Sequence, residues 1–492
     1  MNIKQAKEEV KHTIQAYMQK DEYGIYKMPA IRQRPVLLMG PPGIGKTAIM
    51  EQVAKECEIG LVSYTITHHT RQSAIGLPFI EKKKYGGKEY SITEYTMSEI
   101  IASVYDRMEE TGCREGILFI DEINCVSETL APTMLQFLQC KTFGNHKVPE
   151  GWVIVAAGNP PEYNKSVRDF DIVTLDRVKK INVEEDYAIW KEYAYEKNIH
   201  SSILSYLDVK KEDFYCIETT VDGKEFVTAR GWEDLSQMMY LYEELGYEIT
   251  EGVIIQYLQN RRIAKDFANY LDLYYKYQKQ YQISEILKGK ITKSSVQLLS
   301  KAGFDEKISM VSLLITKLAA HIKTALEQDS FTTELFSKLK EVQKENDILL
   351  VIKRLQVKQE QMRELEMLDV EQDQKMSRLI AQLESYVPIM DENGFEGVKT
   401  EFQKQVQLRK SLLEEAGEKL SYVFLFLEEA FGEGQELVWF VTELTANYYT
   451  SKYISRFGCE KYFYYNKELL LIEKDQELQK EIDEIKDLLE FM

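Results

Sequence analysis

The stretch VLLMGPPGIGKTAIMEQVAKEC, residues 36–57, decides the fold of this chain. The four apolar residues Val36–Met39 predict a short buried strand, and residues 47–57 have the apolar spacing of a helix. The eight residues that follow the strand match the pattern GxxxxGK[ST] of a phosphate-binding loop. These residues are Gly40, Pro41, Pro42, Gly43, Ile44, Gly45, Lys46 and Thr47. A strand, this loop and a helix in succession predict a nucleotide-binding α/β domain.

Each residue type in the loop has a physical role beside a triphosphate. Gly40, Gly43 and Gly45 let the backbone turn tightly, so that its N–H groups can surround a phosphate. Lys46 places a cation at the β- and γ-phosphates, and the Thr47 hydroxyl is a ligand for Mg²⁺. The helix that follows adds the favourable field of its N-terminus. We therefore expect the cofactors to be ATP and Mg²⁺.

Two further apolar segments end in polar residues. Residues 117–120 lead into Asp121 and Glu122, and residues 152–157 lead to Asn159. Ligands of open α/β sheets bind at the carboxyl ends of the strands. There Asp121 suits a Mg²⁺ ligand, and Glu122 suits activation of the attacking water. Asn159 would hold that water or touch the γ-phosphate, or it merely begins a turn with Pro160.

The remaining pattern changes character along the chain. Short apolar segments at 36–39, 61–67, 117–120, 152–157 and 180–183 alternate with helical segments, which predicts a parallel sheet covered on both faces. Nine of the ten prolines occur at or before Pro161, so the rest of the chain is free to be helical. We expect helices over residues 184–281 and from 283 onward. Residues 335–387 predict antiparallel helices, and residues 478–492 predict a short heptad seam.

In this order GPPGIGKT, LFIDEIN, AAGNPPEYN and LDRV resemble the AAA+ superfamily and, within it, the MoxR family, over about residues 1–280. The resemblance implies a five-stranded parallel sheet in the order 5-1-4-3-2 with a helical lid. With the helical pattern, it divides the chain into three parts. These are an AAA+ nucleotide-binding domain (1–183), a helical lid (184–282) and an all-α C-terminal region (283–492) with partial coiled-coil character.

The family also implies two arginines at the nucleotide. Its arginine finger, which reaches the ATP of a neighbouring subunit, matches Arg177 in LDRV, where Val178 replaces the family's Phe. Arg168 in SVRDFD is the alternative candidate for the finger. Either arginine could instead form a surface ion pair that contributes little to stability. The family's sensor 2 matches Arg230 in TARGWEDLS, which would contact the γ-phosphate of its own subunit. The other interpretation is an ordinary helix cap at Thr228 with Arg230 exposed.

The family further implies an insertion in its second helix. Residues 75–93 contain two strand-like runs around Gly86 and Gly87, a hairpin turn signal. Such a hairpin lies near the pore of related rings. There its turn residues would touch a client or would form a solvated turn; these residues are Lys82, Lys83, Lys84 and Tyr85. A second loop, residues 142–147, would face the same pore.

Composition narrows the class of partner. The net charge of −18 disfavours a nucleic acid as the main partner, because an acidic chain gains nothing from the phosphate field. Six cysteines without CxxC spacing indicate reduced thiols, as in the cytoplasm. The first residues carry no apolar segment typical of a signal peptide, and no run reaches the roughly 18 apolar residues of a membrane helix. We expect a cytoplasmic protein without membrane insertion.

Three functions remain in competition. The first is a MoxR-like ATP hydrolase in a homo-oligomeric ring, hexameric by family expectation, that remodels a client protein. The resemblance implies a client with a von Willebrand factor A domain. The second is a nucleic-acid-directed motor of restriction or helicase type, suggested by the basic hairpin and the tyrosine-rich residues 270–281 and 448–465. The third is a non-hydrolysing switch, which the complete set of polar site residues opposes.

Overall fold

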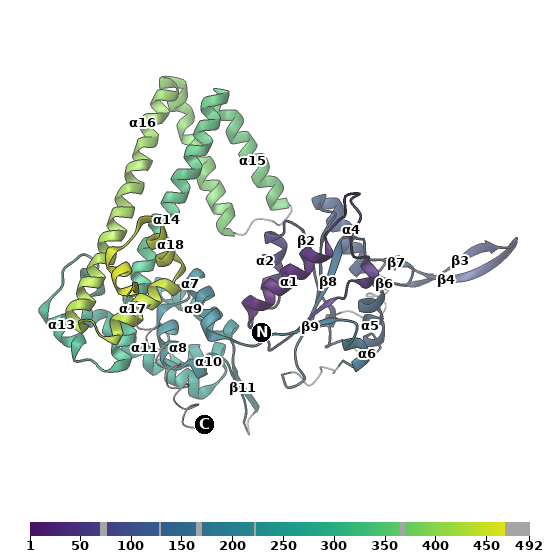
Figure 1. Cartoon of the computed structure of the whole chain (residues 1–492), viewed down its shortest axis with the longest axis horizontal. Coiled ribbons are helices and arrows are strands. Elements are labelled where there is room, and N and C mark those ends of the chain that lie inside the picture. Colours follow the sequence, from purple (N-terminus) through teal and green to yellow (C-terminus); the bar gives the residue numbers. More distant parts are fainter. Residues whose placement is uncertain (69–75, 127–128, 164–169, 221–222, 365–369, 468–492) are drawn as a thin grey trace, which may run out of the picture. The chain divides into compact units, whose positions relative to one another are not determined.

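The structure, a computed structural model, describes residues 1–68, 76–126, 129–163, 170–220, 223–364 and 370–467 (Figure 1). The chain divides into two compact units. The first comprises Met1–Trp190 and Phe214–Asp234, and the second comprises Lys191–Asp213 and Leu235–Met492. The boundaries at residues 183 and 282 remain a proposal for a finer division.

A five-stranded parallel sheet forms the centre of the first unit. Its spatial order is β2-β5-β8-β1-β9. The strands are β1 (Val36–Met39), β2 (Gly60–Thr65), β5 (Gly116–Asp121), β8 (Trp152–Gly158) and β9 (Lys179–Asn182). Counted along the chain and read from β9, this order is 5-1-4-3-2, which confirms the expected topology. Because all neighbours are parallel, the carboxyl ends of β1, β5 and β8 meet at one edge of the sheet.

Helices cover both faces of this sheet. They are α1 (Ile3–Tyr17), α2 (Ala48–Glu56), α4 (Glu99–Thr111), α5 (Ala131–Cys140) and the short α6 (Ile172–Leu175). Successive strand residues point to opposite faces, so Leu38 packs in the cluster of α1 and α2 while Leu37 packs in the cluster of α4 and α5. Burial on both faces explains why β1 and β8 are continuous apolar runs.

Two hairpins leave the sheet where insertions were expected. Strands β3 (Pro78–Tyr85) and β4 (Lys88–Tyr95) pair antiparallel and extend away from the sheet (Figure 1). Gly86 and Gly87 form their turn with φ of +58° and +82°, the backbone that a two-residue hairpin turn requires. A smaller hairpin, β6 (Thr142–Phe143) and β7 (His146–Lys147), occupies the expected second loop.

A third hairpin corrects the sequence prediction. Residues 184–281 are not helical throughout, because β10 (Cys216–Thr220) and β11 (Gly223–Val227) pair antiparallel within them. Their β-branched and aromatic residues, Ile217, Thr219, Thr220, Phe226 and Val227, favour strands. Because the segments on either side have helical periodicity, the sequence analysis assigned this short hairpin to a helix as well.

Most of the remaining described residues lie in helices. They are α7 (Tyr187–Glu196), α8 (Ser201–Val209), α9 (Ala229–Leu245), α10 (Glu251–Leu258), α11 (Arg261–Tyr281), α12 (Ile283–Ile286), α13 (Lys293–Ser300), α14 (Phe304–Glu345), α15 (Ile348–Glu364), α16 (Val370–Phe431), α17 (Gln435–Ala446) and α18 (Tyr448–Phe457). Three one-turn 3-10 helices lie at Ala30–Arg32, Ile66–His68 and Lys211–Asp213. The long helical C-terminal region is therefore confirmed, while the heptad seam at 478–492 lies outside the described residues.

The longest helices pack against one another as the sequence predicts. Helix α14 ends at Asn346, whose φ of +55° reverses the chain into α15. Helix α16 is interrupted at Gly394, so its two parts run in opposite directions (Figure 1). Buried side chains of α14, α15 and both parts of α16 share one core, which includes Leu335, Val351 and Leu383. Antiparallel helices, and not one long coiled coil, occupy this region.

Some tyrosines of the two tyrosine-rich stretches lie in the core of the second unit. Tyr281 is 1% exposed and donates a hydrogen bond to Glu306 over 2.7 Å. Tyr453 is 5% exposed and donates to the Leu413 carbonyl over 2.7 Å. These two rings therefore have no free face on which bases could stack, whereas Tyr448 and Tyr464 of the second stretch are 45% and 53% exposed.

By length and composition, helix α14 is long and apolar enough to cross a membrane. The sequence analysis did not expect this, because polar residues interrupt the apolar residues of this helix. Within the protein, 61% of its most apolar window is buried. The core helix of a soluble protein satisfies the same criterion, so this helix is weak evidence for a membrane span.

Candidate nucleotide-binding site

The loop between β1 and α2 can be built only with glycine at three positions. Gly43 and Gly45 have φ of +74° and +90°, a backbone that residues with side chains rarely adopt. A Cβ atom on Gly40 would lie 2.6 Å from the Val183 carbonyl oxygen. The pattern GxxGxG within residues 40–45 is therefore required by the local backbone as well as by a ligand.

Lys46 lies at the centre of the site. Its ammonium group donates to the carbonyl oxygens of Gly40 (2.8 Å) and Pro41 (2.7 Å) and to Oδ1 of Asn159 (2.9 Å). Burial lowers the pKa of this amine to about 8, while the charges of Asp121 and Glu122 oppose that shift and Arg230 adds to it. The side chain is 8% exposed and is held by weak neutral acceptors, which phosphate oxygens can replace.

Thr47 and Asp121 face each other across the edge of the sheet. The Thr47 hydroxyl donates to Oδ2 of Asp121 over 2.8 Å, and Oδ1 of Asp121 accepts the Glu122 N–H over 2.8 Å. Mg²⁺ in phosphoryl-transfer sites is usually bound by one or two carboxylates together with substrate phosphates. No group of three His, Cys, Asp or Glu side chains suited to a metal occurs in the described part of the chain. The Thr47–Asp121 pair therefore fits Mg²⁺ that a nucleotide helps to hold.

The segment after β5 is joined to the end of β8. Glu122 has φ of +55°, and its carbonyl accepts the Cys125 N–H over 2.8 Å, which closes a tight turn at the strand end. Asn124 then donates from Nδ2 to the Asn159 carbonyl over 2.7 Å. A Cβ atom on Gly158 would lie 2.6 Å from Oδ1 of Asn124, so the two segments touch. Sequence analysis missed Asn124, although its place two residues after Glu122, just after the end of the same strand, was a usable signal.

The start of helix α9 lies against the loop. A Cβ atom on Gly43 would be 3.1 Å from Cβ and Oγ1 of Thr228 and 3.5 Å from Cβ of Arg230. The Thr228 hydroxyl also accepts the Gly231 N–H over 3.3 Å, as a helix cap does. The two interpretations of this segment are therefore compatible, because the capping residue and Arg230 both adjoin the phosphate loop.

Arg177 lies apart from these residues. It follows α6, is exposed, and donates to Oε1 of Gln139. None of the hydrogen bonds within the described ranges joins it to the phosphate loop of its own chain. The alternative finger, Arg168, lies outside the described residues.

Comparison with known proteins agrees with this geometry. Residues 36–177 match the family described as ATPase family associated with various cellular activities (AAA). This part of the chain is therefore similar to AAA ATPase domains. No curated protein matches the chain. Among solved structures, a "putative ATPase" from Cytophaga hutchinsonii is 17% identical, and the match covers 32% of this chain and 43% of that chain with a TM-score of 0.20. A similarity of that extent carries no argument about fold or function.

Proposed function

We propose that the AAA domain hydrolyses ATP in an oligomeric ring and that the chain uses this reaction to remodel a client protein, as MoxR-like ATPases do. One observation carries the proposal. Lys46 contacts Asn159 over 2.9 Å and Thr47 contacts Asp121 over 2.8 Å, so three strand ends bring a cation, a metal-binding pair and a polar amide to one point. The match of residues 36–177 to the AAA family supports it.

The residues divide the chemistry as follows. Backbone N–H groups of residues 43–47 surround the phosphates, and Lys46 exchanges its carbonyl partners for phosphate oxygens. Thr47 and Asp121 would hold Mg²⁺, which would supply positive charge beside the phosphates. Glu122 accepts the proton of the attacking water, and Asn159 orients that water. Arg230 adds positive charge from the start of α9, close to Gly43.

The ring supplies the remaining cation. Arg177 is exposed and makes no hydrogen bond to its own phosphate loop within the described residues, which suits contact with ATP bound to a neighbouring subunit. Such an arginine is worth about 10³ to 10⁵ in rate. Six subunits remain the expectation from the MoxR resemblance. The β3–β4 hairpin and the helical C-terminal region offer surfaces for a client, and a protein with a von Willebrand factor A domain is the client that the resemblance implies.

A trapping experiment tests the proposal. Glu122→Gln removes the water-activating carboxylate without altering the shape of the side chain, so we expect ATP to bind without turnover. The trapped full-length protein is then isolated, and co-purifying molecules are identified by mass spectrometry. Glu150→Gln is the matched control, because Glu150 is an exposed carboxylate of the same unit.

The outcomes separate the candidate functions. A specific protein enriched with Glu122→Gln and not with Glu150→Gln supports a remodelling ATPase. Recovery of nucleic acid alone, with turnover stimulated by DNA or RNA in a steeply salt-dependent manner, would favour the nucleic-acid motor. Unchanged turnover in Glu122→Gln would refute the role of Glu122.

A further inference from the structure

Tyr215, a residue that the sequence did not single out, contacts the phosphate loop from outside. It precedes β10, and its hydroxyl donates a hydrogen bond to the Pro42 carbonyl over 3.1 Å. Both residues belong to the first unit. A second contact ties the same hairpin to the site, because Lys224 donates to the Glu162 carbonyl over 2.8 Å, three residues after Asn159. The hairpin therefore adjoins both the phosphate loop and the segment that carries Asn159.

The Pro42 carbonyl controls a phosphate-binding group. It belongs to the same planar peptide as the Gly43 N–H, and in a trans peptide these two groups point in opposite directions. A bond that holds the Pro42 carbonyl toward Tyr215 therefore directs the Gly43 N–H away from Tyr215. Glycine has no side chain to limit its own rotation, so an external contact of this kind decides the orientation of the peptide.

The support behind Tyr215 is rigid. Phe214 is 4% exposed, and its ring packs against Trp190 with centroids 5.0 Å apart and against Tyr187 at 5.5 Å. The Phe214 carbonyl accepts the Nε1–H of Trp232 over 3.2 Å. Aromatic contacts of this kind fix the backbone from which the Tyr215 ring extends.

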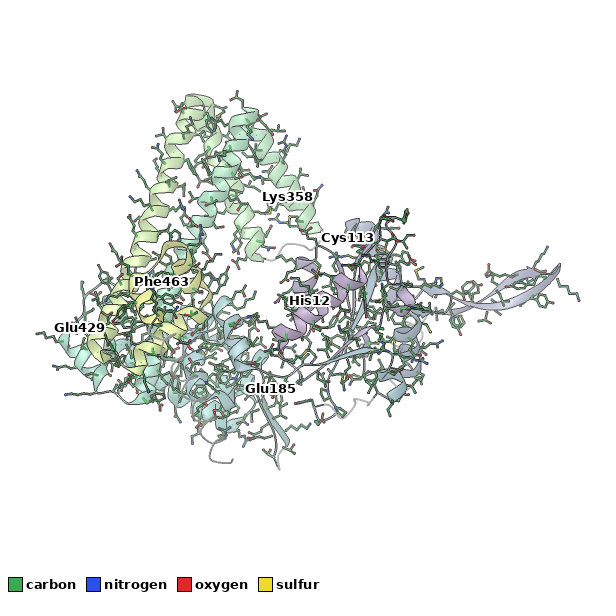
Figure 2. All side chains as sticks on the ribbon, in the orientation of Figure 1. His12, Cys113, Glu185, Lys358, Glu429 and Phe463 are labelled. Carbon is green, nitrogen blue, oxygen red and sulfur yellow. The ribbon has the colours of Figure 1, made fainter. Side chains whose placement is uncertain are left out.

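The phenol remains a donor at working pH. Burial raises the pKa of Tyr215, and the neighbouring charges of Tyr163 and Glu185 act in the same direction. Glu185 is labelled in Figure 2, where it lies on the segment that follows β9. A protonated hydroxyl facing a carbonyl oxygen can act only as the donor of that bond.

We propose that Tyr215 is a positioning residue for nucleotide binding, which acts through the Pro42 carbonyl to hold the Gly43 N–H toward the phosphates of the ligand. The inference rests on the proposed function, in which residues 40–47 bind ATP. It assigns to Tyr215 a part in pre-organising the loop, so that less ordering is needed when the nucleotide binds. Its effect is on the phosphates and not on the base.

The test compares Tyr215→Phe with wild-type full-length protein. The substitution removes one hydroxyl and keeps the ring that packs in the unit. We measure binding of ADP, inorganic tripolyphosphate and adenosine by calorimetry, the KM and kcat for ATP, and the urea midpoint of unfolding. Tyr247→Phe is the control, because Tyr247 is 60% exposed and lies beyond α9.

We expect ADP and tripolyphosphate to bind about threefold to tenfold more weakly, as for loss of one hydrogen bond, with a matching rise in KM. Adenosine binding, kcat and the urea midpoint should stay close to wild type. Wild-type ADP affinity in Tyr215→Phe would overturn the inference, and so would a loss confined to ligands that carry the base. Failure of the wild-type protein to bind ADP at all would instead remove the proposed function itself.

Discussion

The buried amine of Lys46 makes nucleotide affinity depend on pH in a window where ADP itself no longer titrates. Burial lowers the pKa of Lys46 to about 8, so the free protein loses this proton as the pH rises through that value. Phosphates beside the amine favour its charged form and raise its pKa in the complex. Binding above pH 8 must therefore take up a proton, and affinity must fall as the pH increases.

The magnitude follows from the shifted pKa. With a pKa of about 8, the amine is roughly 90% protonated at pH 7 and roughly 10% protonated at pH 9, so ADP should bind about tenfold more weakly at pH 9, or about 1.4 kcal/mol. The terminal phosphate, with a second pKa near 6, contributes little in this range.

Calorimetric titration of full-length protein with ADP at pH 7, 8 and 9 checks this expectation. Repeating each titration in buffers of different ionisation enthalpy counts the protons taken up, which should approach one at pH 9. Lys141→Met is the matched control, because burial lowers the pKa of Lys141 to about 8 as well, and its amine contacts Gln33 rather than the phosphate loop. This variant should keep the wild-type slope, whereas Lys46→Met should bind weakly at every pH. A flat wild-type profile, or a slope that persists without Lys46, would refute the reasoning.

Three further substitutions test other parts of the structure. Arg177→Ala should retain ATP binding but lose about 10³-fold or more in turnover, measured by phosphate release. Arg32 is another exposed arginine of the first unit, and Arg32→Ala should keep the wild-type turnover. Gly43→Ala should weaken ADP binding at least tenfold, because the Gly43 φ is +74° and the new Cβ would crowd Thr228. Gly87→Ala is the control: Gly87 has a similar φ of +82° but open space around it, so ADP binding should stay unchanged. Lys141→Met should raise the free energy of unfolding by about 1–3 kcal/mol at pH 7. This gain in stability should shrink as the pH rises from about 8 toward 10.5, because the folded wild-type protein then no longer holds a buried charge. The free energy of unfolding in urea, measured across this pH range, checks the expectation. A gain that stays constant with pH would contradict it.

Local patterns carried most of the correct predictions. The strand and helix around residues 40–47, and the strands that end at Asp121 and just before Asn159, were predicted because each contains an apolar run that is visible in the sequence. The hairpin at residues 78–95 was found because its Gly86–Gly87 turn needs a backbone that glycine supplies. The hairpin at 216–227 was missed because its strands are short and lie between strongly helical segments.

The sequence by itself determined the strand, loop and helix around residues 40–47, because glycine conformation and strand–loop–helix succession are local properties of the chain. Only the tertiary structure decided which residues meet. Tyr215 reaches the Pro42 carbonyl across 173 positions, and Asn124 reaches the Asn159 carbonyl across 35. Such contacts leave no period or motif in the chain, because they depend on how the sheet and the β10–β11 hairpin pack. The lowered pKa of Lys46 arises in the same way, since burial is a property of the folded domain and not of the lysine.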